Sequence, residues 1–348
     1  MMTQRYQPSN GIQCRDPLLD VREMSAEFRV QEGIVRAVDC VSLYVKHNEV
    51  VGMVGETGCG KTVTVHAIMR LINSPGRITA GEVFLNGRDL MRLSEQQMRR
   101  VRGSEIAMIF QKPMSSMNPV FTLGQQFVDV IRLHRRISHA GAMRIAAEAL
   151  DAVALPDTAG LLRRYPHELS GGQQQRAMIA MALSCGSKLL IADEPTTALD
   201  VSVQLQILKL IRSIMDETRM STLVISHDMG VIGSVCDRIY VMYASRVVES
   251  GPTEEIIDRP QHPYVAGLIN SIPRFESRSE TLEHIRGEVP NPLDPPSGCR
   301  FHPRCGHASA SCADDTPPLL QVGEEHYVTC CRASESREPD ARSVERSS

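Results

Sequence analysis

The stretch that decides the fold reads Gly55-Glu56-Thr57-Gly58-Cys59-Gly60-Lys61-Thr62. It matches the pattern G-x-x-x-x-G-K-[ST] at every fixed position, between an apolar run at 49–54 and a helix-like segment at 63–71. A strand, a glycine-rich turn and a helix N-terminus form a cradle of backbone N–H groups for phosphate, and the glycines let its oxygens approach. Lys61 is predicted to reach the β- and γ-phosphates and the Thr62 hydroxyl to bind Mg²⁺. We expect all eight residues to line a nucleotide site, with Cys59 a bystander in the chemistry.

Composition limits where this nucleotide site can work. The chain has 348 residues, of which 42% are hydrophobic and 23% charged, and its net charge is −3. No apolar run approaches the ~18 residues that a membrane span needs. Residues 1–20 are polar and lack the apolar core of a signal peptide. We therefore expect a cytosolic protein that reaches a membrane only through partners. Its net charge does not suggest general binding to nucleic acid.

The order of strands and helices predicts an α/β fold with a mostly parallel sheet. Short apolar runs in residues 19–45 favour antiparallel strands ahead of the sheet, and a helical pattern from 123 to about 162 resembles an inserted subdomain. Prolines become frequent after residue 258. Further strands are predicted at 81–87 (ending in an Asn-Gly turn), 106–110, 188–192, 222–225, 238–243 and 246–249, and an amphipathic helix carries Ile207, Leu210, Ile211 and Ile214.

The predicted units are a flexible leader (1–18), a nucleotide-binding domain (19–258, with a helical subdomain at about 112–187), an extension (259–331) and a disordered tail (332–348).

Two carboxylates follow the strand at 188–192. Asp193 and Glu194 would lie at the carboxyl edge of the sheet, beside the phosphate loop formed by residues 55–62. Asp193 is predicted to hold Mg²⁺ through water, and Glu194 to polarise the attacking water as general base, a role worth ~10²–10⁴ in rate. Solvated acids at a strand end are the alternative for this pair alone, and the nearby phosphate loop favours catalysis.

A second glycine-containing helix start occurs at Ser170-Gly171-Gly172-Gln173. Ser170 can cap the helix that follows, and the glycines expose its N-terminus as another anion site. A flexible turn is the alternative for this stretch alone. Two such helix starts are hard to bring onto one phosphate within one subunit. We therefore predict a dimer, in which the phosphate loop of one subunit holds ATP while Ser170 and Gly172 of the other close over its γ-phosphate.

Together these motifs resemble the ATP-binding cassette proteins, whose signature sequence residues 169–173 match. The resemblance implies a P-loop NTPase fold: a RecA-like parallel core, an antiparallel β subdomain and an inserted α-helical subdomain. It implies that Gln111 is the Q-loop glutamine, which touches Mg²⁺ and the attacking water, and that Asp200 belongs to the D-loop. His227 would be the switch histidine that contacts the γ-phosphate. Phe28 would be the aromatic residue that stacks on adenine, a position where Tyr is common.

Longer stretches are similar to the ATP-binding subunits of oligopeptide, dipeptide and nickel importers. They are residues 111–119, 165–170 and 236–243, with 262–264 and 298–305 in the extension. This resemblance implies two cassettes, usually two different subunits, that close on two ATP molecules and pull on two membrane permeases. A periplasmic or lipid-anchored binding protein would deliver the solute. The chain would then lie at the cytoplasmic face of the inner membrane, docked through residues 113–122 and the helical block.

Five of the ten cysteines crowd into the last fifty residues. The scattered ones, Cys14, Cys40, Cys59, Cys185 and Cys236, are interpreted as buried or half-buried thiols. The crowded ones are Cys299, Cys305, Cys312, Cys330 and Cys331. They lack the C-x₂₋₄-C pairs typical of zinc modules. Four thiolates are the usual set for a [4Fe–4S] cluster, and the resemblance to peptide importers implies one here, with Cys330 taken over its neighbour as the fourth ligand. Zinc and unliganded thiols remain alternatives.

An importer ATPase for peptides is the leading hypothesis, with nickel or another small solute as the nearest alternative. A soluble cassette ATPase acting on DNA or ribosomes typically has two cassettes or a long coiled coil. Here Lys61 and Asp193 lie 132 residues apart, with no sustained heptads between them, which argues against a soluble cassette ATPase of that kind. Glu194 argues against a non-catalytic regulatory subunit. The sequence leaves open whether the dimer has identical or different subunits.

Overall fold

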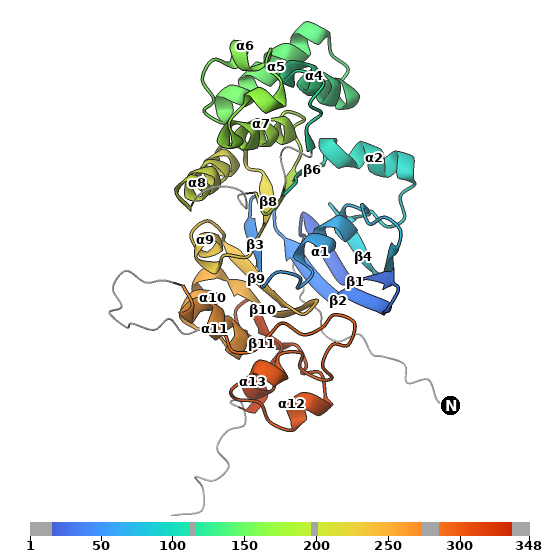
Figure 1. Cartoon of the computed structure of the whole chain (residues 1–348), viewed down its shortest axis with the longest axis vertical. Coiled ribbons are helices and arrows are strands. Elements are labelled where there is room, and N and C mark those ends of the chain that lie inside the picture. Colours follow the sequence, from blue (N-terminus) through green and yellow to red (C-terminus); the bar gives the residue numbers. More distant parts are fainter. Residues whose placement is uncertain (1–15, 112–115, 196–200, 273–284, 336–348) are drawn as a thin grey trace, which may run out of the picture.

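The computed structural model describes residues 16–111, 116–195, 201–272 and 285–335. The molecule is elongated, with a block of helices at one end, two sheets in the middle and the C-terminal segment at the other end (Figure 1). Within the described ranges, no helix has both the length and the apolar character that a membrane crossing requires.

The main sheet has a parallel core around β3 (Val50–Val54). Every residue of β3, β7 (Leu189–Asp193), β8 (Ser221–Ser226) and β9 (Arg238–Tyr243) is buried, which explains why these strands appear in the sequence as continuous apolar runs. Parallel strands bring their carboxyl ends to one edge, and there the predicted site residues follow. The parallel order is β9 (Arg238–Tyr243), β3, β8 (Ser221–Ser226), β7 (Leu189–Asp193) and β6 (Ile106–Ile109).

A second sheet of four antiparallel strands covers one side of α1 (Lys61–Ile68), the helix that follows the glycine-rich loop. Its inner face shares an apolar cluster with β3 and with α1 (Lys61–Ile68). Asn86 and Gly87, with φ of 48° and 72°, form the predicted turn at the end of β4. The strands, in spatial order, are β2 (Gly33–Val45), β1 (Leu19–Val30), β4 (Gly76–Leu85) and β5 (Arg88–Asp89).

The predicted helical block is present between β6 and β7 (Figure 1). Thr122 and Ser170 each form a capping box with the glutamine three residues later, which fixes where their helices begin. The amphipathic helix predicted after β7 is α8 (Val201–Thr218), with Ile207, Ile211 and Ile214 buried. The block contains α4 (Leu123–His134), α5 (His139–Ala152), α6 (Thr158–Leu161) and α7 (Gly171–Leu183). A further helix, α2 (Glu95–Ser104), precedes β6.

The C-terminal extension adds two strands to the main sheet. β12 (His326–Val328) pairs antiparallel with β10 (Arg246–Pro252), and β11 (Leu320–Gly323) pairs with β12. The buried Glu249 carboxylate accepts from His326 Nε2 at 2.8 Å. Further elements are 3-10 turns at Pro166–Glu168 and His302–Arg304, and the helices α9 (Met229–Gly233), α10 (Thr253–Asp258), α11 (Pro263–Asn270), α12 (Ser311–Asp314) and α13 (Cys331–Glu335).

Two predicted boundaries shift by a few residues. Leu18, assigned to the leader, is 1% exposed, and its carbonyl accepts the Asn86 N–H at 2.8 Å. The prediction of a disordered tail from residue 332 is wrong for residues 332–335, because α13 continues to Glu335. Cys40, interpreted as at least half-buried, is exposed, whereas Cys59, Cys185 and Cys236 are buried. Residues 1–15, with Cys14, lie outside the described ranges.

Candidate functional site

The phosphate loop joins the end of β3 to the start of α1, as predicted. Gly60 precedes the helix with φ 105°, a conformation that side chains rarely adopt. A Cβ on Gly60 would stand 2.2 Å from the Ala37 carbonyl oxygen, and one on Gly55 would stand 2.2 Å from that of Met242. These two glycines are therefore required by the backbone that surrounds the loop, as well as by any phosphate inside it.

Lys61 lies within the loop rather than out in solvent. Its side chain is buried, and Nζ donates to the carbonyl oxygens of Gly55 at 2.6 Å and Glu56 at 3.2 Å. The Cys59 sulfur is 3.8 Å from the same ammonium, and burial raises the pKa of this thiol although Lys61 opposes the rise. A protonated, buried thiol agrees with a bystander role for Cys59.

Thr62 and Asp193 face each other between α1 and the end of β7. The Thr62 hydroxyl donates to Asp193 Oδ1 at 3.0 Å. Burial raises the pKa of Asp193, and the Thr62 hydrogen bond partly offsets that rise. A hydroxyl and a carboxylate are ligands suited to Mg²⁺. The structure brings the two side chains together, and their role as Mg²⁺ ligands stays a prediction.

The loops after three neighbouring strands bring Gln111, Glu194 and His227 together. Gln111 Nε2 donates to Glu194 Oε2 at 2.8 Å, and His227 Nδ1 lies 3.7 Å from Glu194 Oε1. Glu194 has a left-handed backbone with φ 46°, and its N–H donates to the Ile225 carbonyl at 3.0 Å. A strained residue held this firmly is suited to aim a carboxylate at one position.

The start of α7 presents an exposed helix N-terminus. Ser170 Oγ accepts from the Gln173 N–H, and Gln173 Oε1 accepts from the Ser170 N–H at 3.0 Å. A Cβ on Gly172 would meet nothing within 4 Å. The helix belongs to the block at one end of the molecule, opposite the C-terminal segment (Figure 1). In the described part of the chain, no hydrogen bond links residues 170–173 to the phosphate loop.

Two predicted nucleotide contacts remain, Phe28 and Asp200. Phe28, on β1, is half-buried, with its ring against Gly76, where a Cβ would come within 2.5 Å of Phe28 Cε1. Its role in stacking on adenine stays a prediction. Asp200 lies in residues 196–200, outside the described ranges.

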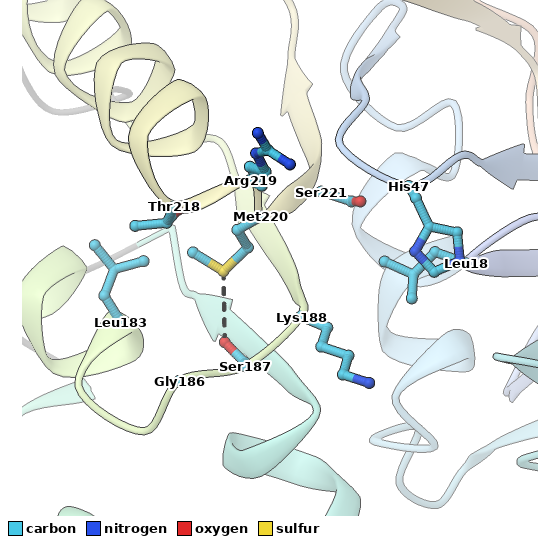
Figure 2. Close-up of a pocket in the computed structure, with 10 residues that line it drawn as sticks. All are labelled: Leu18, His47, Leu183, Gly186, Ser187, Lys188, Thr218, Arg219, Met220 and Ser221. Carbon is cyan, nitrogen blue, oxygen red and sulfur yellow. Dashed lines mark hydrogen bonds between the residues drawn. The ribbon is translucent and has the colours of Figure 1, made fainter.

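A pocket of about 410 Å³ opens at the opposite edge of the main sheet (Figure 2). Its lining includes His47, Lys188 and Ser221, which lie at or before the amino ends of β3, β7 and β8. Every candidate catalytic residue follows the carboxyl end of a strand. This pocket is therefore separate from the nucleotide site.

The crowded cysteines lie within electrostatic range of one another. Burial raises the pKa of the Cys299 and Cys330 thiols, and neighbouring thiols add to the rise. Burial, with Cys312 beside it, raises the pKa of Cys331 to about 12. Among the described residues, no group of three or more Cys, His, Asp or Glu side chains is arranged to hold a metal ion. The four predicted ligands, which include Cys305, therefore do not form a ready coordination set.

Sequence reasoning missed two residues that touch the phosphate loop from the extension. The Tyr264 hydroxyl accepts the Glu56 N–H at 3.0 Å, and Arg304 forms an ion pair with the Glu56 side chain at 2.7 Å. Both lie more than 200 residues from Glu56 in the sequence, so no local pattern could have indicated them.

Comparison with known proteins agrees with this geometry. A family model described as "ABC transporter" matches residues 38–197, and one described as "Oligopeptide/dipeptide transporter, C-terminal region" matches residues 248–312. The chain is 46% identical over 322 residues to a probable peptide ABC transporter ATP-binding protein of Sinorhizobium fredii, covering 92% of this chain and 96% of that protein. It is 45% identical over 333 residues to a putative peptide import ATP-binding protein of Brucella ovis, covering 92% and 98%.

Solved structures support the same assignment. The ATP-binding cassette MJ0796, in a dimeric post-hydrolysis state bound to ADP and Pi, is 26% identical with a TM-score of 0.61, covering 68% of this chain and 98% of that one. The cbiO1 protein of Clostridium perfringens, 23% identical with a TM-score of 0.61, covers 70% and 92% and shows the same fold. This chain belongs to the ABC transporter ATPases, in the group that carries the oligopeptide/dipeptide transporter C-terminal region.

Proposed function

We propose that this chain hydrolyses ATP to power the import of di- and oligopeptides through an ABC transporter. The observation that carries the proposal is the meeting of three strand-end loops at Glu194, beside the Thr62–Asp193 pair and the Lys61 loop. The 65-residue match to the oligopeptide/dipeptide C-terminal region (residues 248–312), and relatives named for peptide import, favour peptides as the solute.

Each site residue then has a role in hydrolysis. Lys61 and the loop N–H groups hold the phosphates, and Glu194 takes a proton from the attacking water, which Gln111 helps to orient. His227 contacts the γ-phosphate. Thr62, Asp193 and Gln111 would hold Mg²⁺, which would supply positive charge for the phosphate oxygens.

A dimer completes the site. The exposed start of α7, Ser170 to Gln173, has free space beside Gly172 for the phosphate of a facing subunit. Asp200, in the predicted D-loop, stays a proposed nucleotide contact. We propose that the second cassette is a different subunit, since paired cassettes of such importers are usually distinct. This chain has Lys61, Ser170, Glu194 and His227, so it can contribute to both composite sites.

Two permeases complete the transporter in this proposal, with a solute-binding protein outside the membrane. Exposed apolar side chains support docking near the helical block: Val120 is 73% exposed, Phe121 46% and Tyr165 39%. Residues 112–115, at one end of the predicted docking segment, lie outside the described ranges. The chain would then lie at the cytoplasmic face of the inner membrane, held there by the permeases. Nucleic acid is not among its proposed partners.

For the cysteine cluster we keep the [4Fe–4S] assignment to Cys299, Cys305, Cys312 and Cys330 as a proposal, with zinc as the alternative. What supports it is the crowding of these cysteines in the extension, where the Cys299 N–H donates to the Cys312 carbonyl at 2.8 Å. Because they form no ready ligand group, binding would require them to rearrange. Iron and sulfide in anaerobically purified protein, with absorbance near 400 nm, would support the cluster; zinc without iron would contradict it.

Uptake by the assembled transporter tests the function. The chain would be expressed with its partner cassette, two permeases and a solute-binding protein, and the complex would be reconstituted in proteoliposomes. We expect ATP-dependent uptake of a labelled dipeptide or oligopeptide. ATP-dependent uptake of nickel but not peptides would replace the proposed solute. Co-purification with ribosomes or DNA, and with no membrane protein, would overturn the transport role.

A further inference from the structure

The C-terminal extension holds the phosphate loop at one residue, Glu56. Arg304 reaches both oxygens of the Glu56 carboxylate, with Nη1 at 2.7 Å from Oε2 and Nη2 at 3.1 Å from Oε1. The Tyr264 hydroxyl accepts the Glu56 N–H at 3.0 Å. The Glu56 carbonyl in turn accepts from Lys61 Nζ at 3.2 Å. One loop residue therefore joins the extension to the lysine that holds phosphate.

Arg304 is held rigidly where it makes this contact. Its side chain is only 6% exposed. Nε donates to the Arg286 carbonyl at 2.9 Å, and Nη1 also donates to the Tyr243 hydroxyl at 3.3 Å. The guanidinium lies 5.7 Å from the Tyr243 ring centroid and 6.0 Å from that of Phe301. A fork held from several sides loses little entropy when it binds a carboxylate in this two-point geometry.

Charge explains why the loop needs this contact. Glu56 places a carboxylate in a loop whose ligand is a polyanion, and an unpaired carboxylate there would repel phosphate. Arg304 neutralises it and orients it through two hydrogen bonds. Arg304 also ends the 3-10 turn that lies between Cys299 and Cys305, so the cysteine-bearing segment supplies the charge.

We propose that Arg304 is a positioning residue of the ATP site, which neutralises and fixes Glu56 so that the phosphate loop binds ATP tightly. The proposal rests on the ATPase function above. It gives the C-terminal extension a role in nucleotide binding through contact with the loop.

The test measures the Kd for MgATP of the full-length chain by calorimetry. Arg304→Gln should raise Kd about tenfold, because removing one partner strands the other charge. Arg304→Lys, which keeps the charge but loses the fork, should raise Kd by a smaller factor. The double variant Arg304→Gln/Glu56→Gln should recover to within about threefold of wild type, since the stranded carboxylate is gone. In the assembled transporter, Arg304→Gln should raise KM for ATP more than it lowers kcat.

Arg300→Gln is the matched control, because Arg300 anchors the same segment to Asp39 and to the Ala244 carbonyl without touching the loop. An Arg304→Gln chain that binds MgATP like wild type, while Lys61→Ala does not, overturns the inference alone. Equal losses in Arg304→Gln and Arg300→Gln also overturn it, because docking of the extension would then suffice. If Arg304→Gln does not fold, an unchanged Kd in Arg304→Lys overturns it. A wild-type chain that does not bind MgATP contradicts the proposed function and the inference together.

Discussion

Replacing Glu194 by Gln should stop hydrolysis and spare ATP binding. The substitution keeps the length of the side chain, and its amide oxygen can still accept the hydrogen bond that Gln111 Nε2 donates at 2.8 Å. The backbone anchor to the Ile225 carbonyl is unaffected. What disappears is the proton acceptor. A general base contributes ~10²–10⁴ in rate, so the activation free energy should rise by ~3–5 kcal/mol.

The assay is phosphate release from MgATP, with Kd measured on the same preparation. We expect turnover to fall by at least about 100-fold while Kd stays within about threefold of wild type. Size-exclusion chromatography should show a dimer with the partner cassette that persists in ATP. Glu82→Gln, at an exposed carboxylate on β4, is the control and should retain full turnover. Turnover near the wild-type value in Glu194→Gln would remove Glu194 from the base role.

Three further changes test the loop, the metal pair and the extension. Gly60→Ala should abolish nucleotide binding and cost at least about 2 kcal/mol of stability, because its Cβ would stand 2.2 Å from the Ala37 carbonyl at φ 105°; a chain that melts and binds like wild type would contradict this. Asp193→Asn should raise the Mg²⁺ concentration that gives half-maximal hydrolysis by about 10–100-fold, and an unchanged Mg²⁺ titration would exclude Asp193 as a ligand. Burial lowers the pKa of His262 from 6.5 to about 4, so the unfolded chain takes up a proton first and stability should fall by ~3 kcal/mol as pH drops from 7 to 4. Denaturant unfolding should show a smaller loss in His262→Phe, and an equal loss in both proteins would contradict this assignment.

The sequence predicts the parallel core because its strands are buried on both faces. The runs at β3, β7 and β8 are apolar and bounded by turn residues, so their positions are predictable to within one or two residues. The phosphate loop has a fixed pattern that places its own strand and helix. The meeting of Gln111, Glu194 and His227 then follows from parallel strands sharing one carboxyl edge.

The extension could not be predicted in the same way. β11 and β12 have four and three residues, too short for a clear alternation of apolar and polar positions. β12 joins the sheet through Glu249, whose buried carboxylate depends on His326, 77 residues away in the sequence. The contact of Arg304 with Glu56 spans 248 residues. Such contacts depend on the packed fold and have no local sequence signal.

Coupling between hydrolysis and uptake decides whether this chain powers a peptide importer. In proteoliposomes that contain the whole transporter and its peptide-loaded binding protein, phosphate release and peptide uptake would be followed together after MgATP is added. We predict that both begin with wild-type protein and that both stop when this chain carries Lys61→Ala. Peptide uptake that continues with Lys61→Ala, or wild-type phosphate release without uptake, would contradict it.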